Sequence, residues 1–121
     1  AEVGVASAMS ASAAVELMGG TPKECTYAAS TVLMNMLGLV CDPVGGLVEV
    51  PCVKRNVGGA VNALAAADMA LAGITSKVPV DQVIDAMKEV GDKMDVSLRE
   101  TGVGGVAGTP AAQEVVEKLG M

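Results

Sequence analysis

Two cysteines mark the segment of this sequence with the strongest potential for chemistry. Cys41 and Cys52 stand at the two ends of CDPVGGLVEVPC, whose glycines and prolines predict a loop. Two thiols at the ends of such a loop could converge on one metal centre, and glycines leave room and free N–H groups for it. The spacing is not a CxxC pattern, and by itself it favours two buried structural cysteines. A zinc site is poorly supported because the chain contains no histidine and no further cysteine pair.

Polar residues directly after Cys52 form a second candidate, made of Lys54, Arg55 and Asn56. A cationic pair and an amide beside a metal centre could bind the carboxylate of a substrate. The alternative is the solvated start of a helix. Cations are mildly unfavourable at a helix N-terminus, and this misfit slightly favours the functional interpretation.

Two weaker candidates lie at the ends of the chain. Arg99, Glu100 and Thr101 precede a glycine-rich segment and could close over a ligand, although a helix end with an ion pair is the commoner case. That segment is not a nucleotide-binding fingerprint, because no strand precedes it and no GK[ST] follows. Ser7 could point at a site or only pack closely, and without a histidine no Ser–His pair can activate it. Cys25 and the methionines are expected in the core.

Helices must position these residues. Apolar periodicity and end signals predict helices over residues 3–18, 22–39, from about 54–57 to 73, from 79 and from 110 to 120. Thr21-Pro22 and Thr109-Pro110 are N-cap and first-turn pairs. A short strand could form over residues 47–50, but it has no obvious partner. The predicted fold class is all-α, a compact bundle of about five helices with a Gly/Pro-rich cysteine loop, in one domain over residues 1–121.

Composition narrows the function classes. The apolar fraction is 51% with Tyr27 as the only aromatic residue, so the core must consist of small and aliphatic side chains. The net charge of −6 argues against nucleic acid. Val57–Ile74 is nearly all apolar, but Asn62 and Asp68 are costly in a membrane, so we predict a buried helix. No signal peptide is visible, and the helical pattern at Ala1 predicts a piece cut from a longer chain. Three cysteines indicate reduced thiols or metal ligands.

Three stretches together resemble a known family. They read AEVGVASAMSASAAVELMGGTP, NMLGLVCDPVGGLVEVPCVKRN and LRETGVGGVAGTP, and they resemble the catalytic alpha portion of the iron–sulfur-dependent L-serine dehydratases from Ala1 to about Pro110. The resemblance implies a cytoplasmic lyase, an L-serine ammonia-lyase of amino-acid degradation and gluconeogenesis. It also implies a beta chain or beta domain as partner and a homo-oligomer, with no membrane or nucleic-acid partner. The segment alone is expected to be inactive.

The same resemblance implies a cofactor and a mechanism. The family holds a 4Fe–4S cluster with three cysteines. Two match Cys41 and Cys52, and the third is expected just upstream of Ala1, since Cys25 is a poor substitute. The free iron acts as a Lewis acid on serine, a base removes the α-proton, hydroxide leaves, and the aminoacrylate hydrolyses to pyruvate and ammonia.

Residue roles in this mechanism are assigned as follows. The expected substrate-binding residues are Lys54, Arg55, Asn56, Ser7 and Thr101. Because the chain has no histidine, the base is expected from the other domain or subunit. Two alternatives remain open: a metal-free helical interaction module, and a related lyase acting on another small amino acid such as L-cysteine.

Overall fold

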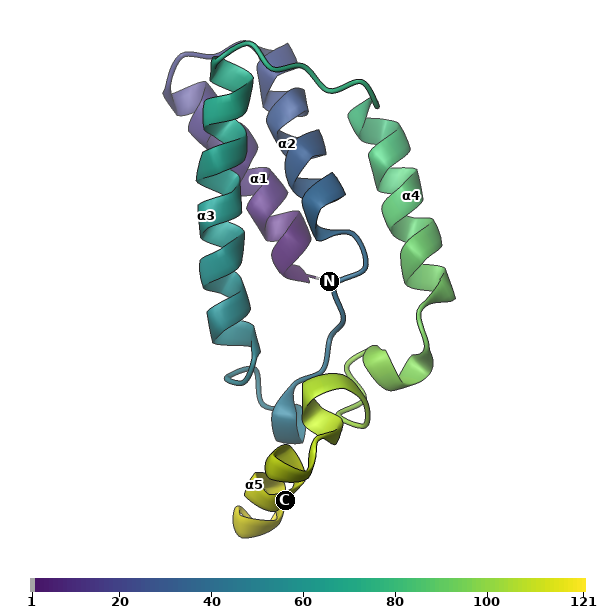
Figure 1. The fold of residues 1–121 in the computed structure, drawn as a ribbon. Coiled ribbons are helices and arrows are strands. Elements are labelled where there is room, and N and C mark those ends of the chain that lie inside the picture. The colour runs from purple at the N-terminus through teal and green to yellow at the C-terminus, as the bar shows by residue number, and fades with distance from the viewer. Residues whose placement is uncertain (1) are drawn as a thin grey trace.

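The fold is all-α, as predicted. The computed structural model describes residues 2–121, in which no strand is present. Figure 1 shows α1–α4 side by side, with α5 beyond one end of them. The elements are α1 (Glu2–Leu17), α2 (Pro22–Met36), the 3₁₀ turn η1 (Val44–Gly46), α3 (Cys52–Leu71), α4 (Val80–Lys93), the 3₁₀ turns η2 (Val96–Leu98) and η3 (Gly105–Gly108), and α5 (Pro110–Lys118).

Small side chains form the core between α1, α2 and α3. These three helices pack against one another, and most of their fully buried residues are alanine or valine. Close approach is tightest where α3 crosses α1. A Cβ on Gly59 would lie 2.9 Å from Cγ2 of Val3, and the Ser7 hydroxyl donates a hydrogen bond of 2.5 Å to the carbonyl of Gly59. Alanine, serine and glycine therefore set the distance between these helices, as the composition predicted.

Most helix ends follow the predicted signals. The side-chain oxygen of Thr21 accepts a hydrogen bond from the N–H of Glu24 at 3.2 Å, and Thr109 caps α5 in the same way. Two boundaries that flank the cysteine loop differ from the prediction, and α5 ends at Lys118 rather than at residue 120. Helix α2 ends at Met36 rather than near residue 39, and α3 begins at Cys52 rather than at residues 54–57. The second difference matters because it places a cysteine in the first turn of a helix.

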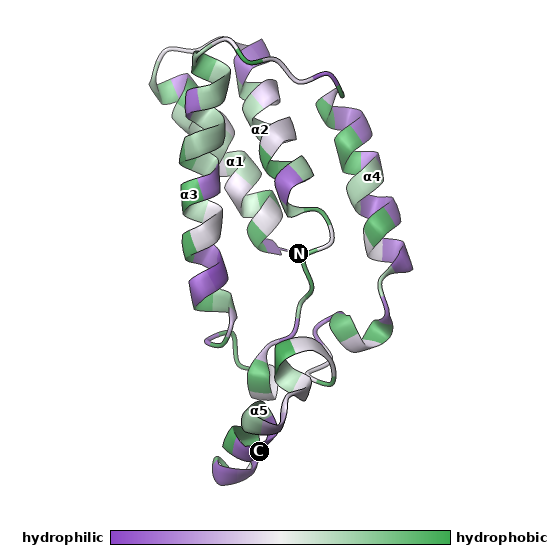
Figure 2. Cartoon of the chain, viewed as in Figure 1, coloured by the Kyte–Doolittle hydropathy of each residue, from purple (hydrophilic) through white to green (hydrophobic). Residues whose placement is uncertain are grey.

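Helix α4 is amphipathic and lies at the periphery of the bundle. It packs against α2 and buries Val83, while Figure 2 shows polar residues along its outer side. Two exposed ion pairs, Lys88–Asp92 and Lys93–Glu89, join residues four positions apart on that side. Such pairs contribute little to stability.

A second group of elements lies beyond the ends of α1–α4. Helix α5 packs with η1 and η3, and η1 packs with η3. The strand considered over residues 47–50 does not form, because residues 48–51 make a turn. An isolated parallel bridge between Cys41 and Arg99 is present instead. The start of the loop is thus paired with a distant segment of the chain, and within the loop the N–H of Val44 donates to the carbonyl of Val50 at 2.9 Å.

Two burial predictions were wrong. Helix α3 is buried along its alanine side only, since Val57, Val61 and Leu64 are each more than 60% exposed within the described residues. The methionines are also not all in the core, because Met9 and Met18 are exposed on the surface. Cys25, by contrast, packs against the core as predicted. No helix among the described residues has the length and apolar character needed to span a membrane.

Candidate metal and ligand site

The two cysteines of the loop line the same cavity, which has a volume of about 400 Å³. Cys52 enters it from the first turn of α3, and Cys41 from the chain that follows α2. Glu2, Arg55, Asn56 and Glu100 are the other polar residues of its wall, and valine and alanine side chains supply the rest. Both thiols are free and partly buried. The structure therefore brings together the residues that the loop pattern could only suggest.

Backbone pairing fixes the position of Cys41. Its N–H donates to the carbonyl of Leu98 at 2.9 Å, and its carbonyl accepts from the N–H of Glu100 at 2.6 Å. Burial raises the pKa of the Cys41 thiol, and the nearby charges of Glu100 and Cys52 act in the same direction. Without a metal the thiol is therefore held in its protonated form more strongly than an ordinary cysteine.

Asp42 joins three separate parts of the chain. It is 1% exposed, and one carboxylate oxygen accepts a hydrogen bond from the guanidinium of Arg55 in α3. The other oxygen accepts from the N–H of Val106 in η3 at 2.5 Å. Burial opposes ionisation of Asp42, but the bonds from Arg55 and Val106 outweigh it and lower the pKa of the carboxyl. We call these three residues the Asp42 clamp.

Glycine is required where η3 meets this clamp. Gly105 has a φ of +63°, and a Cβ on it would lie 2.8 Å from both Cβ and Cγ of Asp42. A larger residue would therefore have to push Asp42 away from Val106. The glycine-rich segment that carried no nucleotide-binding signature has a structural purpose here, which is to let η3 approach a buried carboxylate.

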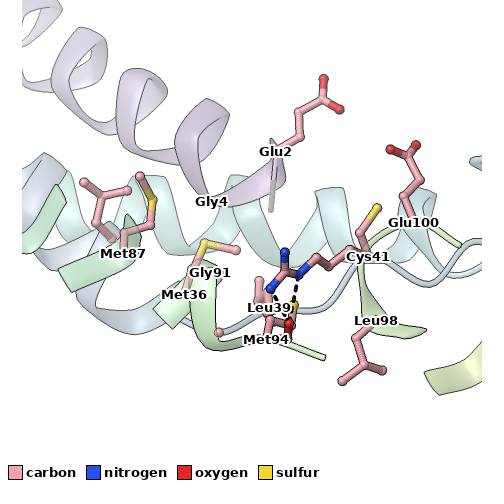
Figure 3. A pocket seen from close by; sticks show the side chains of 13 residues that line it. Glu2, Gly4, Met36, Leu39, Cys41, Met87, Gly91, Met94, Leu98 and Glu100 are labelled. Carbon is pink, nitrogen blue, oxygen red and sulfur yellow. Dashed lines mark hydrogen bonds between the residues drawn. The ribbon is translucent and has the colours of Figure 1, made fainter. Parts of the chain in front are cut away.

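A second, more apolar cavity of about 380 Å³ adjoins the first and shares Glu2, Cys41 and Glu100 with it. Figure 3 shows the Cys41 thiol and the Glu100 side chain next to each other at one end of this cavity, with Met36 and Met87 toward the other end. Arg99, also on its wall, donates hydrogen bonds to the carbonyls of Met94 and Asp92. Arg99 thus closes the C-terminal end of α4 rather than forming the ion pair considered for it.

The remaining predicted site residues do not all line the cysteine cavity. Asn56 lines both the cysteine cavity and a small hollow of about 150 Å³ beside it, and Ser7 lines that hollow. Lys54 is exposed and lines neither cavity, and the Thr101 hydroxyl donates to the carbonyl of Ser97 at 2.9 Å. Sequence reasoning missed Asp42, although a signal existed: the unfavourable cation at the start of α3 needed an acidic partner, and Asp42 is that partner.

The donor set fits part of an iron–sulfur site. Two free thiols that line one cavity are the ligand type such clusters need. Within residues 2–121, however, no group of three or more cysteine, histidine, aspartate or glutamate side chains is placed to hold a metal. Cys41 and Cys52 could therefore supply two ligands, and any third would have to come from elsewhere.

Comparison with known proteins gives this geometry its context. The family model described as "Serine dehydratase alpha chain" matches residues 1–107. The chain belongs to this family. It is 62% identical over 119 residues to "Probable L-serine dehydratase, alpha chain" of Bacillus subtilis (strain 168), and 54% identical over 115 residues to "L-serine dehydratase, alpha chain" of Peptoniphilus asaccharolyticus. It is also 46% identical over 107 residues to "L-serine dehydratase 1" of Escherichia coli (strain K12).

These serine dehydratase relatives are longer than the present chain. The matches cover 98%, 95% and 88% of this chain, but only 40%, 39% and 24% of the three relatives. The chain therefore spans less than half the length of each. Family membership does not favour the metal-free interaction module or the lyase for another amino acid.

Proposed function

We propose that this chain is the part of an L-serine dehydratase that binds its 4Fe–4S cluster, with Cys41 and Cys52 as two of three thiolate ligands. The observation that carries the proposal is the shared cavity, in which both thiols lie beside Arg55 and Asn56. When bound, the cluster would supply a Lewis-acidic iron for the β-elimination of water from L-serine. The products are pyruvate and ammonia.

The residues of this chain then have the following roles. Cys41 and Cys52 hold the cluster, and the third cysteine comes from the part of the enzyme that precedes Ala1. Arg55 and Asn56 face the substrate carboxylate from the first two turns of α3. Lys54, Ser7 and Thr101 remain predicted substrate contacts, although Ser7 and Thr101 already donate to backbone carbonyls. The Asp42 clamp holds Arg55, and with it the first turn of α3, at a fixed position relative to Cys41.

The complete enzyme needs more protein than this chain. With no histidine among the 121 residues, we assign the base to a beta chain or beta domain. The apolar side chains that α3 exposes, Val57, Val61 and Leu64, support packing against further protein. Homo-oligomerisation and a cytoplasmic location belong to the same proposal.

The test is anaerobic reconstitution of the complete enzyme with iron and sulfide. We expect a broad absorption near ~400 nm, typical of thiolate-bound iron–sulfur clusters, and pyruvate release from L-serine. Cys41→Ala and Cys52→Ala should each lose the absorption and the activity. Cys25→Ala is the matched control, because Cys25 packs on the core away from the cavity and should keep both. Full iron content and activity in either cavity variant would reject the assignment.

A further inference from the structure

Glu100 has an unusual backbone conformation. Among residues 2–121 it is the one non-glycine residue with a positive φ, at +64°. A side chain other than glycine is strained in this region, and glutamate lacks the short polar side chain that lets asparagine and aspartate adopt it. The residues around it, Gly102 and Gly105, show that this segment uses glycine where the backbone needs it. A glutamate at position 100 therefore calls for an explanation beyond local folding.

The conformation directs the carboxylate to the cysteines. Its N–H is bonded to the carbonyl of Cys41, and its side chain lines both cavities next to the Cys41 thiol (Figure 3). The carboxylate therefore shares one cavity wall with the Cys41 thiol, Arg55 and Asn56. Because backbone strain disfavours glutamate at position 100, a favourable interaction of its side chain with a ligand would offset that strain.

The cavity has the charge pattern of an amino-acid site. Arg55, which is also bound to Asp42, and Asn56 line it with groups that can bind a carboxylate. Glu100 and Glu2 each contribute a negative charge to the lining, and of these two only Glu100 has a strained backbone conformation. An α-amino acid carries one carboxylate and one ammonium group. The rest of the lining is largely apolar, which strengthens charge-assisted hydrogen bonds by excluding water. The volume of about 400 Å³ falls within the usual range for small-molecule sites.

We propose that the Glu100 carboxylate binds the α-ammonium group of the amino-acid substrate and so selects amino acids over hydroxy acids. This inference rests on the proposed function, because it takes the cysteine cavity as the place where substrate binds. Glu100 then acts on binding and orientation, and the proton transfer belongs to another group.

The test compares two ligands that differ in one group, L-alanine and L-lactate, in the complete anaerobically reconstituted enzyme. Binding of each is measured by calorimetry, together with kcat and KM for L-serine. Glu100→Gln should weaken L-alanine about tenfold or more, leave L-lactate unchanged, and raise KM more than it lowers kcat. Glu100→Asp should recover part of the preference. Glu16→Gln, an exposed carboxylate at the far end of α1, is the control and should behave as wild type.

A second variant separates this role from a structural one. Glu100→Gly relieves the positive φ, so it should keep or raise the unfolding midpoint while losing the preference for L-alanine. A drop in both would indicate a structural role and overturn the inference, as would equal weakening of the two ligands by Glu100→Gln. If wild type makes pyruvate but the variant keeps its preference, only this inference fails. If wild type makes no pyruvate yet shows the Glu100-dependent preference, only the proposed reaction fails. Absence of pyruvate and of any preference rejects both.

Discussion

The helix core and the cysteine region of this chain are held together in different ways. Between α1, α2 and α3, alanine and valine side chains pack in a continuous apolar cluster. Around Cys41, the structure depends on a bridge to Arg99, on the Asp42 clamp and on glycines with positive φ. Apolar packing is spread over many contacts, whereas the clamp concentrates its effect in two hydrogen bonds.

This difference separates stability from site geometry. Truncating a core side chain should lower the free energy of unfolding without moving the cysteines, because no single core contact positions them. Removing a hydrogen bond of the clamp should lower the free energy of unfolding and also move the cysteines, since Asp42 follows Cys41 directly and its partner Arg55 lies three residues after Cys52. Substitutions in the two regions can therefore be matched for stability and compared for their effect on the thiols.

The largest effect is expected from Gly105→Ala. The new Cβ would lie within 2.8 Å of Asp42 atoms and would require a strained φ, so the bond from Val106 to Asp42 should break. We expect a loss of about 3–4 kcal/mol in the free energy of unfolding, measured by urea denaturation.

Gly46→Ala provides the matched control for this substitution. Gly46 also has a positive φ, +73°, but a Cβ there would meet no atom within 4 Å. Only backbone strain remains, so the loss should be about 1–2 kcal/mol. Equal losses in the two variants would show that strain alone accounts for the Gly105 effect and that the contact with Asp42 contributes nothing.

The next effect is that of Asp42→Ala, which leaves Arg55 and the N–H of Val106 without their shared acceptor. We expect the free energy of unfolding to fall by about 2–3 kcal/mol. This is toward the low end for a broken buried ion pair, because the Arg55 side chain is 26% exposed. We also expect faster alkylation of Cys41 and Cys52, followed for each cysteine by peptide mass spectrometry.

Val32→Ala in the core is the comparison for Asp42→Ala. Val32 is fully buried, and its truncation should cost roughly 2 kcal/mol, a similar loss of stability. If the two regions are independent, alkylation of Cys41 and Cys52 should stay at the wild-type rate under native conditions. Equal acceleration in both variants would mean that the cysteines report global opening and that the clamp has no special effect on them.

The sequence predicted the core better than the site. Helix periods and the Thr-Pro starts of α2 and α5 depend on residues close together in the chain, so the all-α fold and most boundaries could be read directly. Burial of α3 was overestimated because composition alone cannot show which side of an apolar helix is covered. The pattern CDPVGGLVEVPC located the loop but did not show that its ends line one cavity.

What sequence reasoning missed depends on contacts between distant residues. Asp42 meets Val106 across 64 positions, and Glu100 pairs with Cys41 across the same kind of separation. No periodicity links such residues. Arg55 shows how a local misfit can still be informative: its unfavourable place at the start of α3 indicated a function, and the structure gives it a partner within the chain. Its role toward substrate remains a prediction.

The smallest effect should come from breaking the exposed pair Lys88–Asp92, which is the surface counterpart of the buried carboxylate of the clamp. Asp92 accepts a hydrogen bond from Lys88 as Asp42 does from Arg55, yet both side chains of this pair are largely exposed. The hydrogen bond to Lys88, with its charge, lowers the pKa of Asp92. Lys88→Ala should raise that pKa toward the ordinary value, measured by NMR titration of the Asp92 carboxyl.

The stability change in Lys88→Ala should be too small to measure at neutral pH, since water and salt screen exposed pairs. Its sign is nevertheless fixed. A carboxyl with a lowered pKa in the folded state contributes stability above its unfolded value of about 3.9, and this contribution is lost as the pH falls through the folded pKa. Wild type and variant should therefore converge once the pH is below the folded pKa, and any difference should be complete only above about pH 4. A loss as large as that of Asp42→Ala would show that burial does not distinguish the two carboxylates. The contrast between the clamp and the exposed surface would then fail.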